Sequence, residues 1–440
     1  MINSRQLVAL ALGMTLHCAA TQAAVLTVNT TADDITPGDG LVSLREAILA
    51  AETDTATDLG QTGSGADIVD LASVQGVIAL NSRLPTISTP IRIIGSPVAR
   101  VTIDGNDGTQ RYPLFVVDGG DLEIRSVDLA NGLAVGGAGG NRQQRSGAGG
   151  GGAGLGGSVF LNAGSLRLQD VAIVGSAVIG GGGGERELGA GSAGGGGGGG
   201  LSLDAPLPVG AHGSDGADGL PLAGLGGSAG STSSPGGTGG EGAGGGGGGS
   251  GNSGEMVVGG TGGFGGGGGG GGYGEVAGSL SPPAGTGGFG GGGGGRGASG
   301  GVTDGPGAVG GLFGGNGGPS SGNGNVGGNA GGGGGLGGAI FARAGTLRLL
   351  DVQFSNCSAT GGAGGQNAGN DGTRGLGKGG AVFIADGVDA QALGITFQGN
   401  SAQDGVGSGY IEGTAVDTVD VYGTLNLLDL IFADGFEGEP

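Results

Sequence analysis

Three aspartates occupy the same place in a repeated ten-residue pattern, and their spacing makes them the first candidates for chemistry. They are Asp170, Asp351 and Asp429. If successive repeats stack, the carboxylates form a ladder that can hold a cation or supply the acid and base for polysaccharide cleavage. Aspartate also begins turns by hydrogen-bonding its own backbone, and each of these three stands where the pattern bends. We therefore favour turn formation and predict no catalytic residue.

The other residues capable of chemistry have no partner at a useful spacing. Asp33–Asp34 and the aspartates of "TIDGNDG" are typical of turns. His212 lies inside glycine-rich sequence. Cys357 takes the place that Ser176 and Asn400 take in their repeats, which indicates a small filler at a bend and not a nucleophile.

The glycine-rich sequence does not match a known ligand-binding motif. It lacks the "GK[ST]" ending of a phosphate-binding loop. "GGxGxN" occurs once, at Gly136–Asn141, without the tandem copies that calcium-binding nonapeptides need. The sequence therefore predicts neither a cofactor nor a metal site, and it favours a protein that is not an enzyme.

The repeated pattern predicts short parallel strands. Its apolar residues alternate within each half, as in a β-strand, and two residues break the alternation between the halves. Repeats of this kind predict an all-β chain, a parallel β-solenoid whose coils bury apolar side chains and bond to the coils above and below. A fifth copy has one extra residue, which suggests a bulge. The copies are "GDLEIRSVDL" from Gly120, "GSLRLQDVAI" from Gly164, "GTLRLLDVQF" from Gly345, "GTLNLLDLIF" from Gly423, and Gly387 to Phe397.

Stacking aligns the apolar positions of the copies in two columns. A second phrase, "GG-small-apolar-Phe" at Gly156, Gly337 and Gly379, supplies a third strand per coil, and less regular strands upstream bring the total to six or seven coils. Arg167 and Arg348 are expected to face outward beside Glu123 and to pair with it along the stack. A β-sandwich with glycine-rich loops is the alternative, but it does not predict near-identical phrases. The columns are Leu122, Leu166, Leu347 and Leu425, and Val127, Val171, Val352 and Leu430.

Long glycine-rich excursions leave the repeats at equivalent points, so they should project from one corner. Of the 440 residues, 128 are glycine, and glycine loses the most backbone freedom on ordering. Closing the longest excursion, Gly180 to Gly335, as a mobile loop costs on the order of 4.5 kcal/mol. Ordering it costs on the order of 150 kcal/mol. We therefore expect a mobile fringe. The alternative is a bundle of left-handed, three-residue-per-turn helices held by backbone hydrogen bonds.

The N-terminal residues indicate export. Residues 1–23 contain Arg5, the apolar run "LVALALGMTL" and small residues before Ala23, as in a secretory signal peptide. We expect no transmembrane segment in the mature chain.

The net charge of −21 argues against nucleic acid as a partner. The predicted parts are the signal peptide 1–23, a cap with the first coils 24–179, a glycine-rich insertion 180–335, further coils 336–432, and a tail 433–440.

A short helix is predicted near the start of the mature chain. Ser43 followed by Glu46 is a capping box, and the helix over about Leu44 to Glu52 has an apolar face that can cover the first coil. We expect Arg45 to be solvated or paired locally, with a ligand carboxylate as the alternative.

"LTVNTTADD…DGLVSLREAILAAE" resembles the N-terminal module of CSLREA-domain proteins, although Val42 stands where that family has its cysteine. "GGAIF" and "FQGNSA" also look like repeats of polymorphic outer-membrane proteins. These resemblances imply a right-handed parallel β-helix in a secreted or surface-exposed bacterial protein. The ending "IFADGFEGEP" resembles short tails of secreted bacterial proteins.

Together these features predict an exported, non-catalytic, adhesin-like protein of the cell surface or extracellular matrix. Glycans or other cell-surface components are the expected partners. Two alternatives remain: a β-helix enzyme that acts on polysaccharides, and a glycine-rich protein that binds ice or another surface.

Overall fold

The computed structural model describes most of the chain. The described residues are 23–106, 111–142, 145–185, 194–208, 212–251, 257–274, 281–299, 305–321, 326–366, 369–407 and 419–428. Residues 1–22 of the predicted signal peptide and the whole predicted tail, with Asp429 and Leu430, lie outside these ranges.

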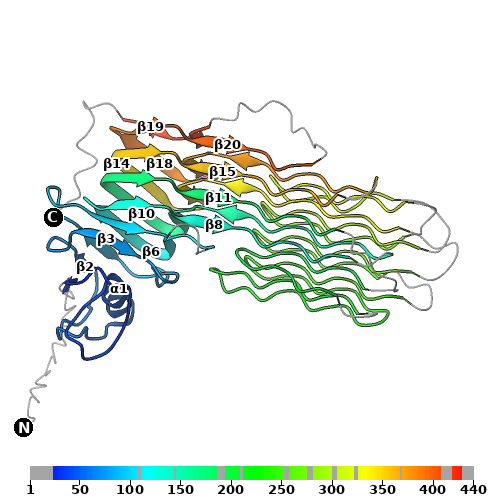
Figure 1. Cartoon of the computed structure of the whole chain (residues 1–440), viewed down its shortest axis with the longest axis horizontal. Coiled ribbons are helices and arrows are strands. Elements are labelled where there is room, and N and C mark those ends of the chain that lie inside the picture. Colours follow the sequence, from blue (N-terminus) through cyan, green and yellow to red (C-terminus); the bar gives the residue numbers. More distant parts are fainter. Residues whose placement is uncertain are drawn as a thin grey trace, which may run out of the picture.

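The described chain is all-β apart from one helix, and its strands pair in parallel in three sheets (Figure 1). The largest sheet contains β1 (Val25–Thr27), β2 (Asp67–Asp70), β3 (Gly76–Ala79), β4 (Ile91–Ile94), β5 (Val101–Asp104), β6 (Phe115–Arg125), β7 (Asp128–Ala130), β10 (Val159–Val174), β13 (Ile340–Ala342), β14 (Thr346–Ser355), β17 (Val382–Ile384), β18 (Asp389–Leu393), β19 (Thr396–Gln398), β21 (Val421–Tyr422) and β22 (Asn426–Leu427). A second sheet contains β8 (Leu133–Val135), β11 (Ala177–Ile179), β15 (Ser358–Thr360) and β20 (Ser401–Gln403). The third contains β9 (Gly154–Leu155), β12 (Gly335–Leu336) and β16 (Gly377–Lys378).

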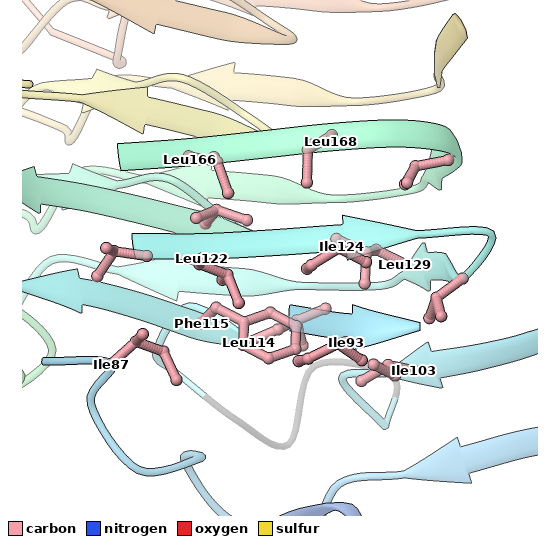
Figure 2. Packing of buried hydrophobic residues seen from close by; sticks show 14 of the residues in the cluster. Ile87, Ile93, Ile103, Leu114, Phe115, Leu122, Ile124, Leu129, Leu166 and Leu168 are labelled. Atoms are coloured by element: carbon pink, nitrogen blue, oxygen red, sulfur yellow. The ribbon is translucent and has the colours of Figure 1, made fainter. Parts of the chain in front are cut away.

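The repeats stack in the predicted register. Leu166 of β10 pairs with Leu122 of β6 on one side and with Leu347 of β14 on the other, and Val171 pairs with Val352. All five side chains are buried in one apolar core. Figure 2 shows Leu122 and Leu166 on adjacent strands, with Ile124 and Leu168 beside them. Parallel in-register pairing gives every layer the same inward positions, so apolar side chains stack in columns.

The fifth copy differs from the expectation of a bulge. Asp389 to Leu393 pair with Thr346 to Leu350, and Thr396 to Gln398 continue the same register with β14. Gly387, with φ of 88°, corresponds to Gly345, with φ of 98°, so the extra residue is Val388, just before β18. Leu425, the last described member of its predicted column, packs against the core.

The predicted helix is present as α1 (Leu44–Thr53). The Ser43 side chain accepts a hydrogen bond from the Glu46 N–H, which caps the helix. The Glu46 carboxylate does not complete the capping box, because it accepts from the Asp58 N–H instead. Burial and the nearby Asp58 charge raise the pKa of Glu46. The apolar face of α1 joins the core beside β1 and β2.

The glycine-rich sequence is not a mobile fringe in this structure. It forms a bundle of extended segments beyond the strands (Figure 1). Within a segment, backbone bonds to any one neighbour recur every third residue. Gly136, Gly139 and Arg142, for example, donate to the carbonyls of Ile179, Gly182 and Glu185. A three-residue repeat whose glycines have no positive φ, except near turns, is that of a left-handed polyproline II helix.

The hydrogen bonds arrange these segments in four layers. Segments of one layer run in the same direction, and adjacent layers run in opposite directions. Because loops from several repeats contribute, the bundle is wider than Gly180 to Gly335. Layer 1 contains 235–241, 257–264, 281–289 and 305–312. Layer 2 contains 225–231, 242–251, 265–274, 290–299 and 313–321. Layer 3 contains 194–201, 212–219, 147–155, 326–336 and 369–378. Layer 4 contains 136–142, 180–185, 361–366 and 403–407.

A central segment has six bonded neighbours. Gly267, Gly268 and Gly269 donate to three segments and accept from three others, through bonds to Gly199, Gly292 and Gly260 and from Gly245, Gly150 and Gly285. A Cβ on Gly267 would lie 2.0 Å from the Gly150 carbonyl oxygen, and one on Gly268 would lie 2.0 Å from that of Gly285. No side chain fits on any of the three sides, so these positions require glycine. Backbone bonding in place of side-chain packing orders the segment.

Aromatic residues join the bundle to the strands. Two of the hairpins between layers 1 and 2 turn at Phe264 and Phe289, followed by Gly265 and Gly290 with φ of 76° and 74°, as type II turns require. The Phe264 and Phe289 rings stack with centroids 5.2 Å apart. They belong to an apolar cluster with Phe160, Phe341 and Phe383, the phenylalanines of the "GG-small-apolar-Phe" phrases.

Candidate functional site

The aspartate ladder lies at bends, as predicted. Asp170 and Asp351 have φ of 52° and 51°, in the left-handed region. Asp170 accepts from the Arg100 guanidinium at 2.9 Å and from the Ser126 hydroxyl at 2.7 Å. Asp351 is exposed. The two carboxylates border a polar hollow of about 250 Å³, with Arg100, Asp128 and Gln353.

Arg100 determines the chemistry of this hollow. Its guanidinium binds both carboxylate oxygens of Asp128, at 2.9 and 2.6 Å, and also reaches Asp170. The hydrogen bond from Arg100 to Asp128 is the main cause that raises the pKa of Arg100. Because the cation already pairs with two carboxylates, Asp170 serves to fasten adjacent layers. Among the described residues, no cluster of His, Cys, Asp or Glu is arranged to hold a metal ion.

Arg45 is paired locally, as we expected. It binds both oxygens of Asp33 at 2.8 Å, and it donates to the Ser82 and Arg83 carbonyls. The Arg45 side chain is 13% exposed and that of Asp33 is 1% exposed. The pair therefore fixes the α1 region to the first strands.

The expected pairing of Glu123 with Arg167 and Arg348 is only partly right. Arg167 lies in register with Glu123, but the Glu123 carboxylate pairs with Arg92 at 3.0 Å and with Arg125 at 3.1 Å. Arg348 pairs with Asp389. The sequence repeat places these charges on one surface, but which charges meet depends on side-chain reach across layers.

Cys357 and His212 lie apart from any site. Cys357 is fully buried, its N–H donates to the Asn400 side chain, and burial raises the pKa of its thiol to about 11. A neutral buried thiol is a poor nucleophile. His212 is exposed at the start of a layer 3 segment.

The other candidate surface is the outer side of layer 1, which the sequence reasoning missed. Each layer 1 segment reads X-G-G-X-G-G-X, where G is glycine or alanine: "PGGTGGE", "VGGTGGF", "PAGTGGF" and "PGAVGGL". The middle X residue is exposed in each segment, whereas Phe264 and Phe289 at the last X are half-buried. This aligned heptad was visible in the sequence and is the signal that would have identified the surface. We call the outward side chains the layer 1 face: Pro235, Thr238, Val258, Thr261, Pro283, Thr286, Pro306 and Val309.

Backbone bonds hold the layer 1 face in two aligned rows. Gly239 donates to the Thr261 carbonyl at 2.9 Å, Gly262 to Thr286 at 2.9 Å, and Gly287 to Val309 at 3.2 Å. The corresponding bonds from Gly236 and Gly259 join the row of Pro235, Val258 and Pro283. Along a segment the rows repeat after three residues, about 9 Å in a polyproline II helix. Across segments they repeat at about 4.8 Å, the spacing of chains joined by backbone hydrogen bonds.

The eight residues of the layer 1 face are all uncharged. Two charges lie beside it. Arg296 of layer 2 donates to the Ser281 and Pro306 carbonyls at 2.8 and 3.2 Å. Glu241 lies at the end next to the strands. Glu241 pairs with Arg343 at 3.0 Å, and the Arg343 guanidinium lies 3.7 Å from the centroid of the Phe264 ring. In a chain of net charge −21, this is an uncharged patch with alternating hydroxyl, methyl and ring groups.

Comparisons with known protein families, curated proteins and solved structures find no match. The resemblance to CSLREA-domain proteins therefore depends on the quoted residues. Within the described residues, no helix has the length and apolar character needed to cross a membrane.

Proposed function

We propose that this protein is an exported, non-catalytic surface protein that makes adhesive contacts through its polyglycine bundle. In this proposal the parallel sheets wind as a right-handed β-helix of six or seven coils, as in the CSLREA-domain proteins that the N-terminus resembles. The predicted signal peptide supports export to the cell surface or the extracellular matrix. Glycans or other components of cell surfaces are the proposed partners.

The layer 1 face is the observation on which this proposal depends. A mobile fringe would lose its conformational entropy on contact. The bundle is ordered before contact, because the backing glycines of a segment bond in turn to the next layer 1 segment and to layer 2, as Gly262 does to Thr286 and Gly263 to Ala243. A preorganised row of exposed side chains can therefore bind without a further ordering cost.

The alternative of a polysaccharide-acting enzyme is less well supported. Its best candidate carboxylate, Asp170, is engaged by Arg100 and Ser126. Depolymerisation of an acidic polysaccharide by the purified protein, lost in Asp351→Asn, would favour the enzyme.

A binding screen tests the proposal. The purified mature chain is applied to glycan arrays and to intact bacterial and eukaryotic cells, beside Thr261→Lys on the layer 1 face. The matched control is Ala363→Lys, at an exposed outward position of layer 4. We expect wild-type and Ala363→Lys to bind equally and Thr261→Lys to bind less. Equal binding by all three, or binding by none, would contradict the proposal.

A further inference from the structure

The layer 1 face has the properties of a surface that binds a flat, ordered solid. Its side chains stand at a regular spacing in two directions. The glycines behind them are hydrogen-bonded and closely packed, so the backbone that carries these side chains is held in place. Partners with a single flexible chain need grooves or pockets, and the hollow of about 260 Å³ beside this row lies at its edge, lined by Val309, Leu312 and Phe313. The occupant that matches is itself flat and periodic.

The composition of the face narrows the occupant further. None of its eight residues is a lysine or arginine that could bind phosphate groups or anionic lipids. The guanidinium of Arg296, beside Pro306, is engaged by the Ser281 hydroxyl and by the Ser281 and Pro306 carbonyls. Phe264 and Phe289, which could stack on sugar rings, are directed into the junction with Phe341. What remains is threonine hydroxyl and methyl groups beside valine and proline, a mixture that can hydrogen-bond weakly while excluding strongly hydrated groups.

We infer that the layer 1 face binds ice. Its repeat of about 9 Å along the segments and about 4.8 Å across them is close to two and one lengths of the hexagonal ice a axis. Charged side chains would hold liquid-like hydration shells in place, and the face has none. Threonines in register can hold water molecules at lattice positions. This inference rests on the proposed function, because it uses the same layer 1 face, but it names ice as the bound solid. Ice binding can therefore fail while the proposed adhesive function stands.

Ice recrystallisation and freezing-point hysteresis of the full mature chain test this inference. Wild-type protein should slow recrystallisation and separate the melting and freezing points. Thr261→Lys should lower both activities roughly tenfold, because an ammonium placed against an uncharged solid loses its hydration without compensation. Thr261→Val keeps the shape of the side chain and should retain most of the activity. Ala363→Lys, on the opposite side of the bundle, should leave it unchanged.

Each outcome decides the inference. Absence of both activities in a folded wild-type protein, verified by circular dichroism, overturns it, as does an equal loss in Thr261→Lys and Ala363→Lys. If Thr261→Lys fails to fold, Thr238→Lys and Thr286→Lys replace it. Binding of crystalline chitin or cellulose without ice activity, lost in Thr261→Lys, would overturn ice as the occupant while leaving the proposed function in place. If no surface is bound, both fail.

Discussion

The two halves of this molecule use the same backbone bonding and opposite side-chain rules. In the stacked strands, Leu166 fits between Leu122 and Leu347, and removal of apolar surface from water stabilises the layers. In the bundle, the backbone of Gly268 contacts the neighbouring backbones directly, and a Cβ there would clash with the carbonyl oxygen of Gly285. A β-strand has two faces, so it can bury one and expose the other. A polyproline II segment has three sides, so an interior segment has none free. A strand can therefore carry side chains on its buried face, whereas an interior polyproline II segment, bonded to neighbours on all three sides, can carry none.

The largest effect should come from adding a side chain at the centre of the bundle. Gly268→Val places carbon atoms against the Gly285 carbonyl, and we expect it to destabilise the fold by about 3 kcal/mol or more. Chemical denaturation followed by circular dichroism measures this. Thr286→Ala, which changes an outward residue, should stay within about 0.5 kcal/mol of wild type. Similar stabilities for the two variants would disprove the three-sided rule.

Removing a side chain should have the converse effect in the strands. Leu347 is fully buried between Leu166 and Ala390, so we expect Leu347→Ala to cost about 3 kcal/mol through lost burial and a residual cavity. Leu225→Ala is the control, because Leu225 is 76% exposed on the bundle. The same denaturation experiment applies. If only Leu225→Ala lost stability, apolar burial would stabilise the bundle and not the strands, which would contradict this prediction.

A smaller effect is expected at the junction. Arg343 contacts Glu241 and the Phe264 ring, both in layer 1 turns. Because these groups are partly exposed, Arg343→Ala should cost about 1 kcal/mol. Amide hydrogen exchange should quicken at Gly265 and Gly266 in particular. Arg348→Ala removes a pair on the strand surface and should leave those amides unchanged. Unchanged exchange in both variants would mean that the aromatic cluster alone holds the turns.

An effect confined to alkaline pH is expected at Cys357. Its folded pKa is raised to about 11 from 9.0, so the folded state retains a proton that the unfolded state loses. The stabilisation is complete below pH 9 and is lost as the pH rises towards 11. Wild type should lose more stability than Cys357→Ala over that interval, and the native thiol should react slowly with alkylating reagents at pH 8. Rapid alkylation of folded protein would contradict the buried position.

Sequence periodicity predicted the strand half well, because a two-residue alternation is a direct record of one buried face. It placed Leu166 against Leu347, and the cap residue Ser43 placed the start of α1. The same reasoning failed for the bundle. The expectation of a mobile fringe counted the entropy of the glycines but not the bonds that glycine alone permits. The X-G-G-X-G-G-X heptads marked the outer segments, while runs such as Gly265 to Gly272 marked inner ones. Which segment lies beside which depends on long-range packing that no local pattern encodes.

The opposed directions of neighbouring layers have a consequence for how such a molecule can change in size. Each hairpin between layers 1 and 2, such as 257–274 or 281–299, adds one segment to each of these two layers. Because the two segments are antiparallel, the hairpin begins and ends at the same end of the bundle. Duplication of one hairpin in the gene would widen the slab by a column and leave the strands untouched. A bundle of this kind can therefore evolve its width in whole steps, independently of the scaffold that carries it.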